Sequence, residues 1–584
     1  MNDKPFRSGN GDNNNNNSGK ILPFRQDIDF YLSQAEKKLD RNDLLAATER
    51  YRRAFLSDPS DLDACLALAD MLGRMQRYEE SNRILLVDMS MNDPDPESYF
   101  GLACNYYGMQ EFDYARESLE TYLQMEPDGN YADDAAEFLE VLNDESELRY
   151  AIGSEKESSE TLMVCARARR LSETGNIPEA DSMLTDYIER YPDALRAKHT
   201  LASVRFMQDK KEDALKLVEE VIHADRLNVS ARCSKVLFLR TLKRNDEADR
   251  EMDAILSLRV DFGVEELGAI ALLQLEAEQW EKALNTCEQL TGFLPYDPLA
   301  LHHLASARYM LGDDDGAAEC YRTLLRIDPD DTVAKFYAAH CRRKKPTGKR
   351  HAFPLTYQVP ITEIVRRLHK ITQSLTEDKE NFVSRWKNDR AFRNLLVWSI
   401  SIPGDKYTAE MLSIIASAGD EDAERVIRDF LLRTDKDDTL KHYAVSLIGR
   451  LNPDRCVMLF CEGAWIRGEL TDLQSEVKLP MAYECMLAIL ANNVANEDCP
   501  QKAVQAMGDI MHTLYDHYNG KLPPMTKERM LATAAALEVL GRSGAGLTVD
   551  KKAIASRYHV TLRRLENAIL RLTRILAEAR KEQS

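Results

Sequence analysis

The chain has 584 residues and a formal net charge of -20, with 44% hydrophobic and 30% charged residues. This length exceeds that of a typical domain about three- or four-fold, and the composition fits a globular protein rather than a disordered one. The sequence contains neither an 18-residue apolar run nor a basic and then apolar leader, so we expect no membrane span, no secretory signal and a cytoplasmic location.

Residues 1–27 differ in composition from the rest of the chain. They include the run SGNGDNNNNNSGK, which offers almost no apolar surface to offset the entropy lost on ordering. We therefore expect a disordered, low-complexity tail, with helical patterns beginning at Ile28.

Small residues recur at a nearly constant spacing through the first 320 residues. They are Ala47, Ser81, Ala115, Ala180, Ala214, Ala248, Ala283 and Ala317. The steps between them are 34, 34, 65, 34, 34, 35 and 34 residues. A fixed period in this range indicates a solenoid, because one helix pair cannot bury its apolar face without stacking on the next pair.

Most repeats also carry a large and small residue pair, twelve residues before the recurring small residue. Examples are Leu201-Ala202 and Leu304-Ala305. At the recurring small residue of the second helix, two helices cross closely, and a larger side chain would push them apart. A proline follows the second helix in most copies, where it cannot disrupt helical hydrogen bonds. These features resemble the tetratricopeptide repeat over most of the segment from Ile28 to Arg343.

The resemblance implies an all-α fold, in which an α-solenoid of tetratricopeptide repeats in two stacks is followed by a C-terminal helical domain. We expect the first stack with a capping helix over residues 28–143 and the second over 161–345. Between them, residues 144–160 belong to a strongly acidic stretch and are expected to form a solvated linker, with binding of a basic ligand as the less favoured alternative.

The resemblance further implies that the first helix of each repeat lines a concave groove that binds peptide segments or partner helices. The groove residues expected on this basis are Phe100, Tyr107, Arg169, Arg196, His199, Phe206, Arg240, His302 and Tyr309. The three arginines are suited to pairing with carboxylates of a partner. Some relatives clamp the C-terminal carboxylate of chaperones with Lys and Asn, but the matching positions here are Leu32, Glu36 and Gly101, so that activity is not transferred.

Beyond the eighth repeat, residues 346–359 are expected to form a basic linker. The stretch from Arg342 to Arg350 has six Lys or Arg residues and no acid. A connector kept in solution by its charges is the favoured interpretation, and contact with an anionic partner is the alternative.

Residues 360–520 remain helical in rhythm without the 34-residue period. The segments DAERVIRDFLLRT and DTLKHYAVSLIGRLN predict two amphipathic helices, with Asp438 as the N-cap of the second. Their order resembles a HEAT-type helix pair. We therefore expect a helical, HEAT-like region.

Residues 521–584 are predicted to be helical and to contain a unit that resembles a helix-turn-helix. The stretch DKKAIASRYHVTLRRLENAIL predicts a short helix, a turn at Tyr558 to Val560 and an N-cap at Thr561. The resemblance implies these candidate nucleic-acid contacts: Lys551, Lys552, Thr561, Arg563 and Arg564. Two packed helices with basic outer faces are the favoured alternative, because the usual turn glycine is missing.

Catalytic motifs for nucleotide binding, zinc proteolysis and serine hydrolysis are absent from the sequence. His302 and His303 are adjacent and so point about 100° apart on a helix, which makes them surface or groove histidines rather than metal ligands. We therefore expect no enzyme activity, no cofactor and no bound metal.

The favoured function is a cytosolic protein-protein interaction scaffold or adaptor that binds partner peptides or helices in its grooves. The alternative is a transcriptional regulator with a C-terminal helix-turn-helix-like DNA-binding unit and a repeat region that senses a partner. The expected partners are other proteins, with nucleic acid less favoured and no membrane, and the sequence leaves the oligomeric state open.

Overall fold

The computed structural model of the chain describes most residues from 28 to 582. The described ranges are 28–143, 159–173, 176–343, 350–376, 379–402, 405–452, 456–461, 464–468, 483, 486–487, 489–490, 493–494, 499–518, 522–523 and 525–582. The expected tail over 1–27 lies outside these ranges. So do residues 144–158 of the acidic linker and 346–349 of the basic linker.

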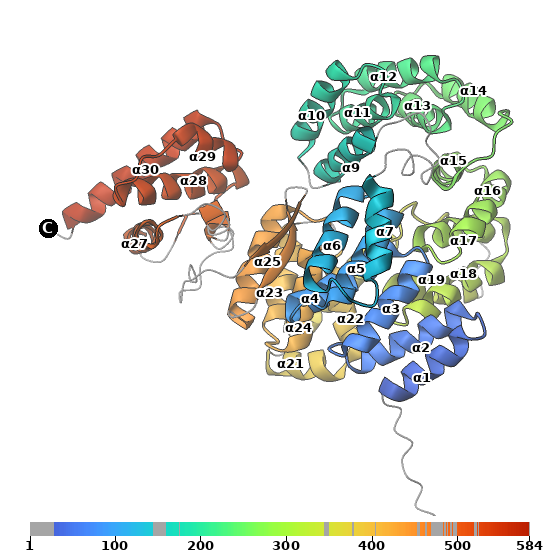
Figure 1. Cartoon of the computed structure of the whole chain (residues 1–584), viewed down its shortest axis with the longest axis horizontal. Coiled ribbons are helices and arrows are strands. Elements are labelled where there is room, and N and C mark those ends of the chain that lie inside the picture. The colour runs from blue at the N-terminus through green and yellow to red at the C-terminus, as the bar shows by residue number, and fades with distance from the viewer. Residues whose placement is uncertain are drawn as a thin grey trace, which may run out of the picture.

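The first stack consists of antiparallel helix pairs followed by one further helix (Figure 1). Its helices are α1 Ile28–Leu39, α2 Leu44–Ser57, α3 Leu62–Arg74, α4 Tyr78–Met91, α5 Pro96–Gly108, α6 Phe112–Met125 and α7 Ala132–Asn143. Asp43, Asp61 and Asp95 cap α2, α3 and α5 by accepting backbone N–H groups at 3.1, 2.8 and 2.9 Å. Such caps satisfy donors that have no partner within the helix.

The recurring small residues lie buried where paired helices cross. Ala47 and Ala115 have no exposed surface, and Ser81 is almost fully buried. The Ser81 hydroxyl donates to the Ala69 carbonyl at 2.7 Å and accepts from the Asn105 amide at 2.8 Å. Serine can replace alanine at this crossing because its hydroxyl is satisfied as both donor and acceptor.

A residue with positive φ follows the first helix of most repeats. These residues are Asn42, Gln76, Gln110, Asp209, Lys243, Glu278 and Gly312, with φ between 54° and 98°. Within each stack they are 34 or 35 residues apart, like the small residues. The left-handed conformation ends one helix and directs the chain into the next.

The second stack contains five helix pairs and a closing helix within the described residues. Its helices are α9 Ser159–Glu173, α10 Ile177–Arg190, α11 Leu195–Met207, α12 Lys211–Ala224, α13 Val229–Thr241, α14 Asn245–Leu256, α15 Val264–Glu276, α16 Trp280–Phe293, α17 Pro298–Leu311, α18 Asp314–Ile327 and α19 Thr332–Arg342. In Figure 1 this stack forms an arch that returns to the beginning of the first stack.

The two stacks are in contact at both ends of this arch. At the closing end α18 packs against α2, and Arg52 Nε donates to the Ile327 carbonyl at 3.0 Å. At the opening end the Arg170 guanidinium pairs with Glu111 and lies 4.6 Å from the ring centroid of Tyr114. The repeats therefore form a closed arrangement instead of two independent rods.

The C-terminal third continues as helices and includes one β-hairpin. The helices are α20 Ile361–Thr376, α21 Lys379–Asn388, α22 Arg390–Ser399, α23 Asp405–Ala416, α24 Glu421–Leu431, α25 Asp438–Leu451, α27 Gln501–His517, α28 Lys527–Gly544, α29 Lys551–Arg557 and α30 Leu562–Glu582. The antiparallel strands are β1 Val457–Cys461 and β2 Ala464–Gly468, with Val457 opposite Gly468. The hairpin was not predicted, because a short apolar run such as VMLFC fits a strand or a helix equally well.

The cap of α25 differs from the sequence prediction by one residue. Asp437 Oδ1 accepts the Thr439 backbone N–H at 2.8 Å, whereas Asp438 is the first residue of the helix. The prediction of Asp438 as the N-cap was therefore wrong. With two adjacent aspartates, the sequence does not show which one precedes the first helical residue.

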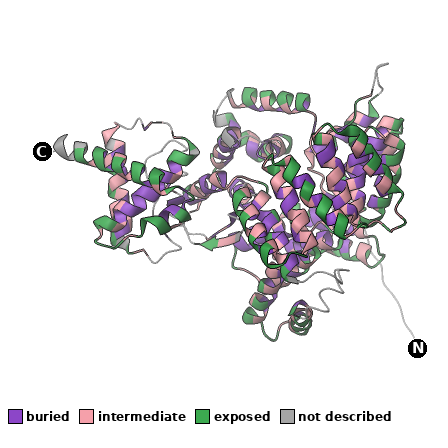
Figure 2. Ribbon diagram, turned by 90° about the horizontal axis from the view of Figure 1, so that it is seen from above, coloured by how far each residue is buried: buried purple, intermediate pink, exposed green. Residues whose placement is uncertain are grey.

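Helix α24 joins the C-terminal helices to the first stack by packing against α4. Arg425 donates to the Pro59 carbonyl at 3.0 Å, and Arg83 lies 3.6 Å from the Asp429 carboxylate. Figure 2 shows buried residues on the sides of the helices that face other helices and exposed residues on the outer sides. Among the described helices, none has both the length and the apolar character needed to cross a bilayer. The predicted all-α fold with an α-solenoid is confirmed.

Candidate functional site

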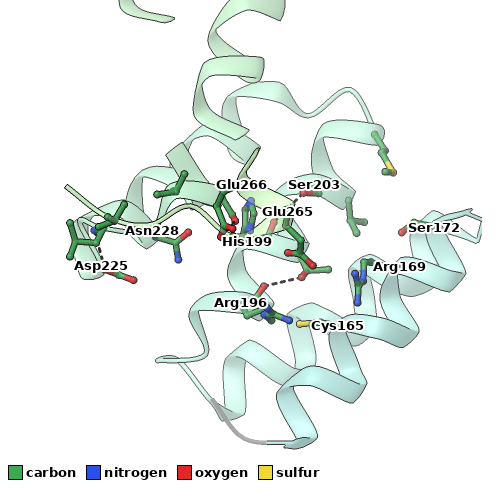
Figure 3. A pocket seen from close by; sticks show the side chains of 18 of the residues that line it. Cys165, Arg169, Ser172, Arg196, His199, Ser203, Asp225, Asn228, Glu265 and Glu266 are labelled. Carbon is green, nitrogen blue, oxygen red and sulfur yellow. Dashed lines mark hydrogen bonds between the residues drawn. The ribbon is translucent and has the colours of Figure 1, made fainter. Parts of the chain in front are cut away.

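The first helices of four successive repeats, α9, α11, α13 and α15, line a cavity of about 900 Å³ in the second stack (Figure 3). The connections before α13 and α15 complete its wall. This is the face that the repeat resemblance assigns to the groove. We call it the α11 cavity, because α11 contributes the largest share of its wall.

Three of the nine predicted groove residues line the α11 cavity: Arg169, Arg196 and His199. Figure 3 shows both arginines on the same side of the cavity, beside Cys165. Arg169 is exposed, whereas Arg196 is half-buried and its Nη1 lies 3.5 Å from Gln110 Oε1 of the first stack. The two guanidinium groups make this side of the cavity positively charged.

His199 contributes a neutral hydrogen-bonding group. Its Nε2 lies 2.8 Å from Ser234 Oγ. Burial, and to a smaller extent the charge of Arg196, lowers the pKa of His199 to about 4. The imidazole therefore offers one donor and one acceptor at neutral pH and carries no charge.

Four carboxylates that were not selected from the sequence also line the α11 cavity. They are Asp225, Asp261, Glu265 and Glu266. Ser230 Oγ donates to Glu266 Oε1 at 3.2 Å. Glu265 occupies the same repeat position as Ser230 and Arg196, at intervals of 35 and 34 residues. The side chain at this repeat position is a cation in α11, a hydroxyl in α13 and an anion in α15. An alignment of the repeats at this position would have identified the acidic wall.

The edge of the α11 cavity is apolar. Met207 and Leu227 both line it, with 58% and 59% of their surface exposed. Large apolar side chains that are more than half exposed are typical of binding surfaces when they lie together. The cavity thus combines apolar contacts at its edge with charges of both signs on its walls.

Phe206 and Arg240, which were also predicted, are not among the lining residues of the α11 cavity. The Phe206 ring stacks on Phe238 with centroids 4.4 Å apart. Arg240 donates to the Leu273 carbonyl at 2.9 Å, and its second guanidinium nitrogen lies 3.7 Å from Asp249. Both side chains therefore contact the neighbouring repeat.

In the first stack, the predicted residues Phe100 and Tyr107 lie against α7 and the residues before it. The Phe100 ring stacks on Tyr131 with centroids 4.6 Å apart, and Tyr107 meets Phe138 edge to face at 5.0 Å. Residues that close the stack therefore cover this part of the predicted groove.

At the end of the second stack, residues 350–359 of the same chain cross α17 and α19; we call them the strap. His302 Nε2 donates to the Pro354 carbonyl at 2.8 Å. The Phe353 backbone N–H donates to Ser306 Oγ at 3.2 Å. The main chain of the strap therefore obtains its hydrogen bonds from side chains of α17.

Further contacts extend along the strap. His303 Nε2 donates to the Leu355 carbonyl at 2.8 Å, and Tyr337 of α19 donates to the Gln358 carbonyl at 2.9 Å. The part of the predicted basic linker that the structure describes is therefore bound to the repeats.

The strap covers two predicted groove residues, His302 and Tyr309. The Phe353 ring lies 4.6 Å from the Tyr309 ring centroid. His302 is fully buried, and burial lowers its pKa to about 4. His302 and His303 were expected to be surface or groove histidines; both are buried beneath the strap, so neither lies on an open surface. Contact of His302 or Tyr309 with a separate partner stays a prediction.

The C-terminal unit has its elements where the sequence predicts them. A turn joins α29 to α30, with φ of 50° at His559, and Thr561 Oγ1 accepts the Arg564 N–H at 3.4 Å. The Tyr558 hydroxyl fixes this turn to α28 by donating to Glu538 at 2.7 Å. The five candidate nucleic-acid contacts are all exposed: Lys551, Lys552, Thr561, Arg563 and Arg564. Their contact with nucleic acid stays a prediction.

Metal ligation has no visible basis in the described part of the chain. No group of three or more His, Cys, Asp or Glu side chains there is arranged to hold a metal ion. The adjacent histidines of α17 instead bond to strap carbonyls.

Comparison with known proteins finds a family match and a curated relative. Residues 298–331, which contain α17 and α18, match the family model of the tetratricopeptide repeat. The TPR repeat-containing protein YvcD of Bacillus subtilis (strain 168) is 26% identical over 319 residues, which cover 52% of this chain and 63% of that protein. The matched region thus spans less than two thirds of this relative.

Two solved structures of low sequence identity are also similar. The TPR domain of P58(IPK) is 15% identical, with a TM-score of 0.22, over 54% of this chain and 97% of that one. A tetratricopeptide repeat protein from Parabacteroides merdae ATCC 43184 is 12% identical, with a TM-score of 0.22, over 55% of this chain and 100% of that one. Residues 298–331 thus match a tetratricopeptide repeat, the helix pairs before them recur at the same period, and the chain is similar to a curated TPR repeat-containing protein.

Proposed function

We propose that this protein is an interaction scaffold that binds a segment of a partner protein in the α11 cavity. The observation that carries the proposal is the composition of this cavity: exposed Met207 and Leu227 at its edge, arginines on one wall and carboxylates on another. Stacked repeats present such extended surfaces to other polypeptides. A cytoplasmic location stays a prediction.

The form of the cavity favours a polypeptide over a small molecule. Its lining is spread over four helices, and several of its side chains, including Arg169, Met207 and Glu265, are exposed to solvent. Small-molecule sites usually enclose most of the ligand within a mainly apolar lining. A chain segment laid across the repeats can instead contact the apolar edge and both charged walls together.

Site-specific photo-crosslinking tests this proposal. A photoreactive amino acid at Met207 is expected to crosslink the full-length protein to a partner polypeptide in the native host. The matched control carries the same group at Lys216 of α12, whose side chain is 74% exposed and does not line the cavity. Identical products from both positions, or none from Met207, would contradict binding in the α11 cavity.

DNA binding is the second candidate function. The observation that favours it is the exposure of all five candidate contacts on a unit whose turn is anchored by Tyr558. Replacement of Arg563 and Arg564 by alanine is expected to weaken binding to duplex DNA and to reduce its dependence on salt. Fluorescence anisotropy at several salt concentrations measures both effects, and unchanged affinity would remove this candidate.

A further inference from the structure

Helices α11 and α17 carry matching side chains at matching repeat positions. The pairs, each 103 residues apart, are His199 with His302, Ser203 with Ser306 and Phe206 with Tyr309. This distance equals three repeats, so paired residues occupy the same place on their helices. In α17 the first two positions bond the main chain of the strap, and in α11 the same two positions line the α11 cavity.

The strap shows how an extended chain lies on this set of side chains. Arg350 Nη1 donates to the Tyr309 carbonyl at 2.6 Å near the end of α17. The following residues of the strap then bond to Ser306 and, one turn closer to the start of the helix, to His302. The strap therefore runs antiparallel to α17 and meets its last turn first.

We propose that the α11 cavity binds an extended segment of a partner polypeptide, antiparallel to α11, through main-chain hydrogen bonds to Ser203 and His199. The segment carries an acidic side chain that meets Arg196. This inference rests on the proposed function, because it specifies the ligand of the same cavity.

The acidic side chain follows from the charge near the start of α11. Arg196 lies one turn before His199, and Arg169 of α9 lies on the same side of the cavity (Figure 3). In a segment antiparallel to α11, the residue that contacts Arg196 follows the residue that contacts His199 by two or three positions. A carboxylate placed there pairs with a guanidinium group. Glu265 and Glu266 on the α15 wall disfavour a segment that is acidic throughout.

The two sites differ in Thr200, which occupies the position of His303, and in Ser234 of α13, which bonds to His199. In α17 the Tyr321 hydroxyl bonds to His302 Nδ1 at 2.7 Å, and Nε2 faces the strap. In α11 it is His199 Nε2 that lies 2.8 Å from Ser234 Oγ. Ser234 does not line the cavity, so its hydroxyl holds the His199 ring in place, and His199 contributes the bond to a main-chain group of the ligand.

The strap itself supplies the probe, a fluorescent peptide of residues 350–359, RHAFPLTYQV. We expect it to bind the full-length protein by anisotropy, and Ser203→Ala to weaken this binding about fivefold through loss of one hydrogen bond. Ser203→Thr, which keeps the hydroxyl, is the matched control. A second peptide that carries Thr356→Glu is expected to bind several-fold more tightly than the first peptide. In the protein variant Arg196→Glu, the first peptide should instead bind more tightly than the second.

Three outcomes would overturn the inference. Peptide binding that is insensitive to both Ser203→Ala and Arg196→Glu places the peptide elsewhere. Binding that weakens with Ser306→Ala but not with Ser203→Ala shows exchange with the strap on α17. An oligomer that the peptide dissociates in sedimentation experiments identifies the strap of a second copy as the occupant.

Failure of this inference is distinguishable from failure of the proposed function. If the peptide does not bind but the photoreactive group at Met207 still captures a partner, the cavity is a binding site for another kind of segment. If both experiments fail, the proposed function fails as well. Circular dichroism and thermal unfolding of each variant check that its fold is intact.

Discussion

Helices α11 and α17 share a histidine and a serine on the groove face, but within the described residues only α17 is covered by a segment of the chain. In each helix the serine follows the histidine by four residues. On α17 the strap covers these side chains, and His302 is fully buried. On α11 the equivalent His199 and Ser203 are only partly buried and line a cavity. A repeat surface thus becomes core or remains a site according to whether a segment crosses it.

The strap also has a role that an exchangeable ligand would not have. Trp398 Nε1 of α22 donates to Gln358 Oε1 at 3.2 Å, and Arg367 of α20 donates to the Thr332 carbonyl of α19 at 2.9 Å. The strap and the helices after it therefore attach together to the last repeat. The α11 cavity has no covalently linked segment of this kind among the described residues.

The largest expected effect concerns the buried ring of the strap. Phe353→Ala is expected to lower the free energy of unfolding by about 4 kcal/mol, because the ring packs against Tyr309 and Tyr337 and its loss leaves a cavity. Urea unfolding followed by circular dichroism measures the change. The exposed Thr356→Ala is the control and should change stability little. A small loss for Phe353→Ala would mean that the strap is held only by its main chain.

The next effect tests the burial of His302 through the pH dependence of stability. Burial lowers the pKa of His302 to about 4, whereas an unfolded histidine titrates at about 6.5. As pH falls through 6.5 the unfolded chain binds the proton first, so the contribution of His302 to stability declines between pH 6.5 and 4. We expect His302 to account for about 2 kcal/mol of lost stability between pH 7.5 and pH 5.

Comparison with His302→Gln isolates this contribution from other titrating groups. Glutamine can still donate to the Pro354 carbonyl but does not titrate. Between pH 7.5 and pH 5 the variant should therefore lose about 2 kcal/mol less of its free energy of unfolding than the unmodified protein. Equal losses in urea unfolding at the two pH values would show that His302 is accessible to protons in the folded protein.

A smaller effect tests the charged wall of the α11 cavity. Arg196→Glu is expected to weaken binding of the Thr356→Glu peptide about tenfold, since an attractive charge pair becomes repulsive. Lys216→Glu changes the net charge equally but lies outside the cavity, so it should leave affinity nearly unchanged. Anisotropy titrations of both variants give the comparison. Similar weakening by both would mean that net charge alone governs binding.

The repeat architecture was predictable because its signals are local and periodic. The spacing from Ala47 to Ala317 sets the helix crossings, and the residues with positive φ repeat at the same interval. The contact of Arg52 with Ile327 was not predictable, since it joins residues 275 positions apart and follows from the curvature of the whole stack. Periodicity determines how neighbouring repeats pack, but curvature is the sum of many small rotations.

The candidate site was predictable only in part for a related reason. Arg169, Arg196 and His199 were found by their position in the repeat, whereas the acidic wall required comparison of Arg196 with Glu265 across repeats. The sequence does not show that the strap binds the repeats, because its side-chain contacts, such as Phe353 with Tyr309 and Arg350 with Asp314, have no repeat period and its other contacts are made by main-chain groups. A main chain has no residue pattern that sequence analysis can detect.

The smallest expected effect compares one substitution in the two helices. Ser306→Ala removes the acceptor for the Phe353 backbone N–H and should lower the free energy of unfolding by about 1 kcal/mol. Ser203→Ala removes the same hydroxyl from α11 and should leave stability unchanged while weakening peptide binding. Urea unfolding and anisotropy, each applied to both variants, separate the two roles. If Ser203→Ala destabilised the protein as much as Ser306→Ala, the Ser203 hydroxyl would stabilise the fold in the same way as the Ser306 hydroxyl. The two helices would then not differ in the role of this serine.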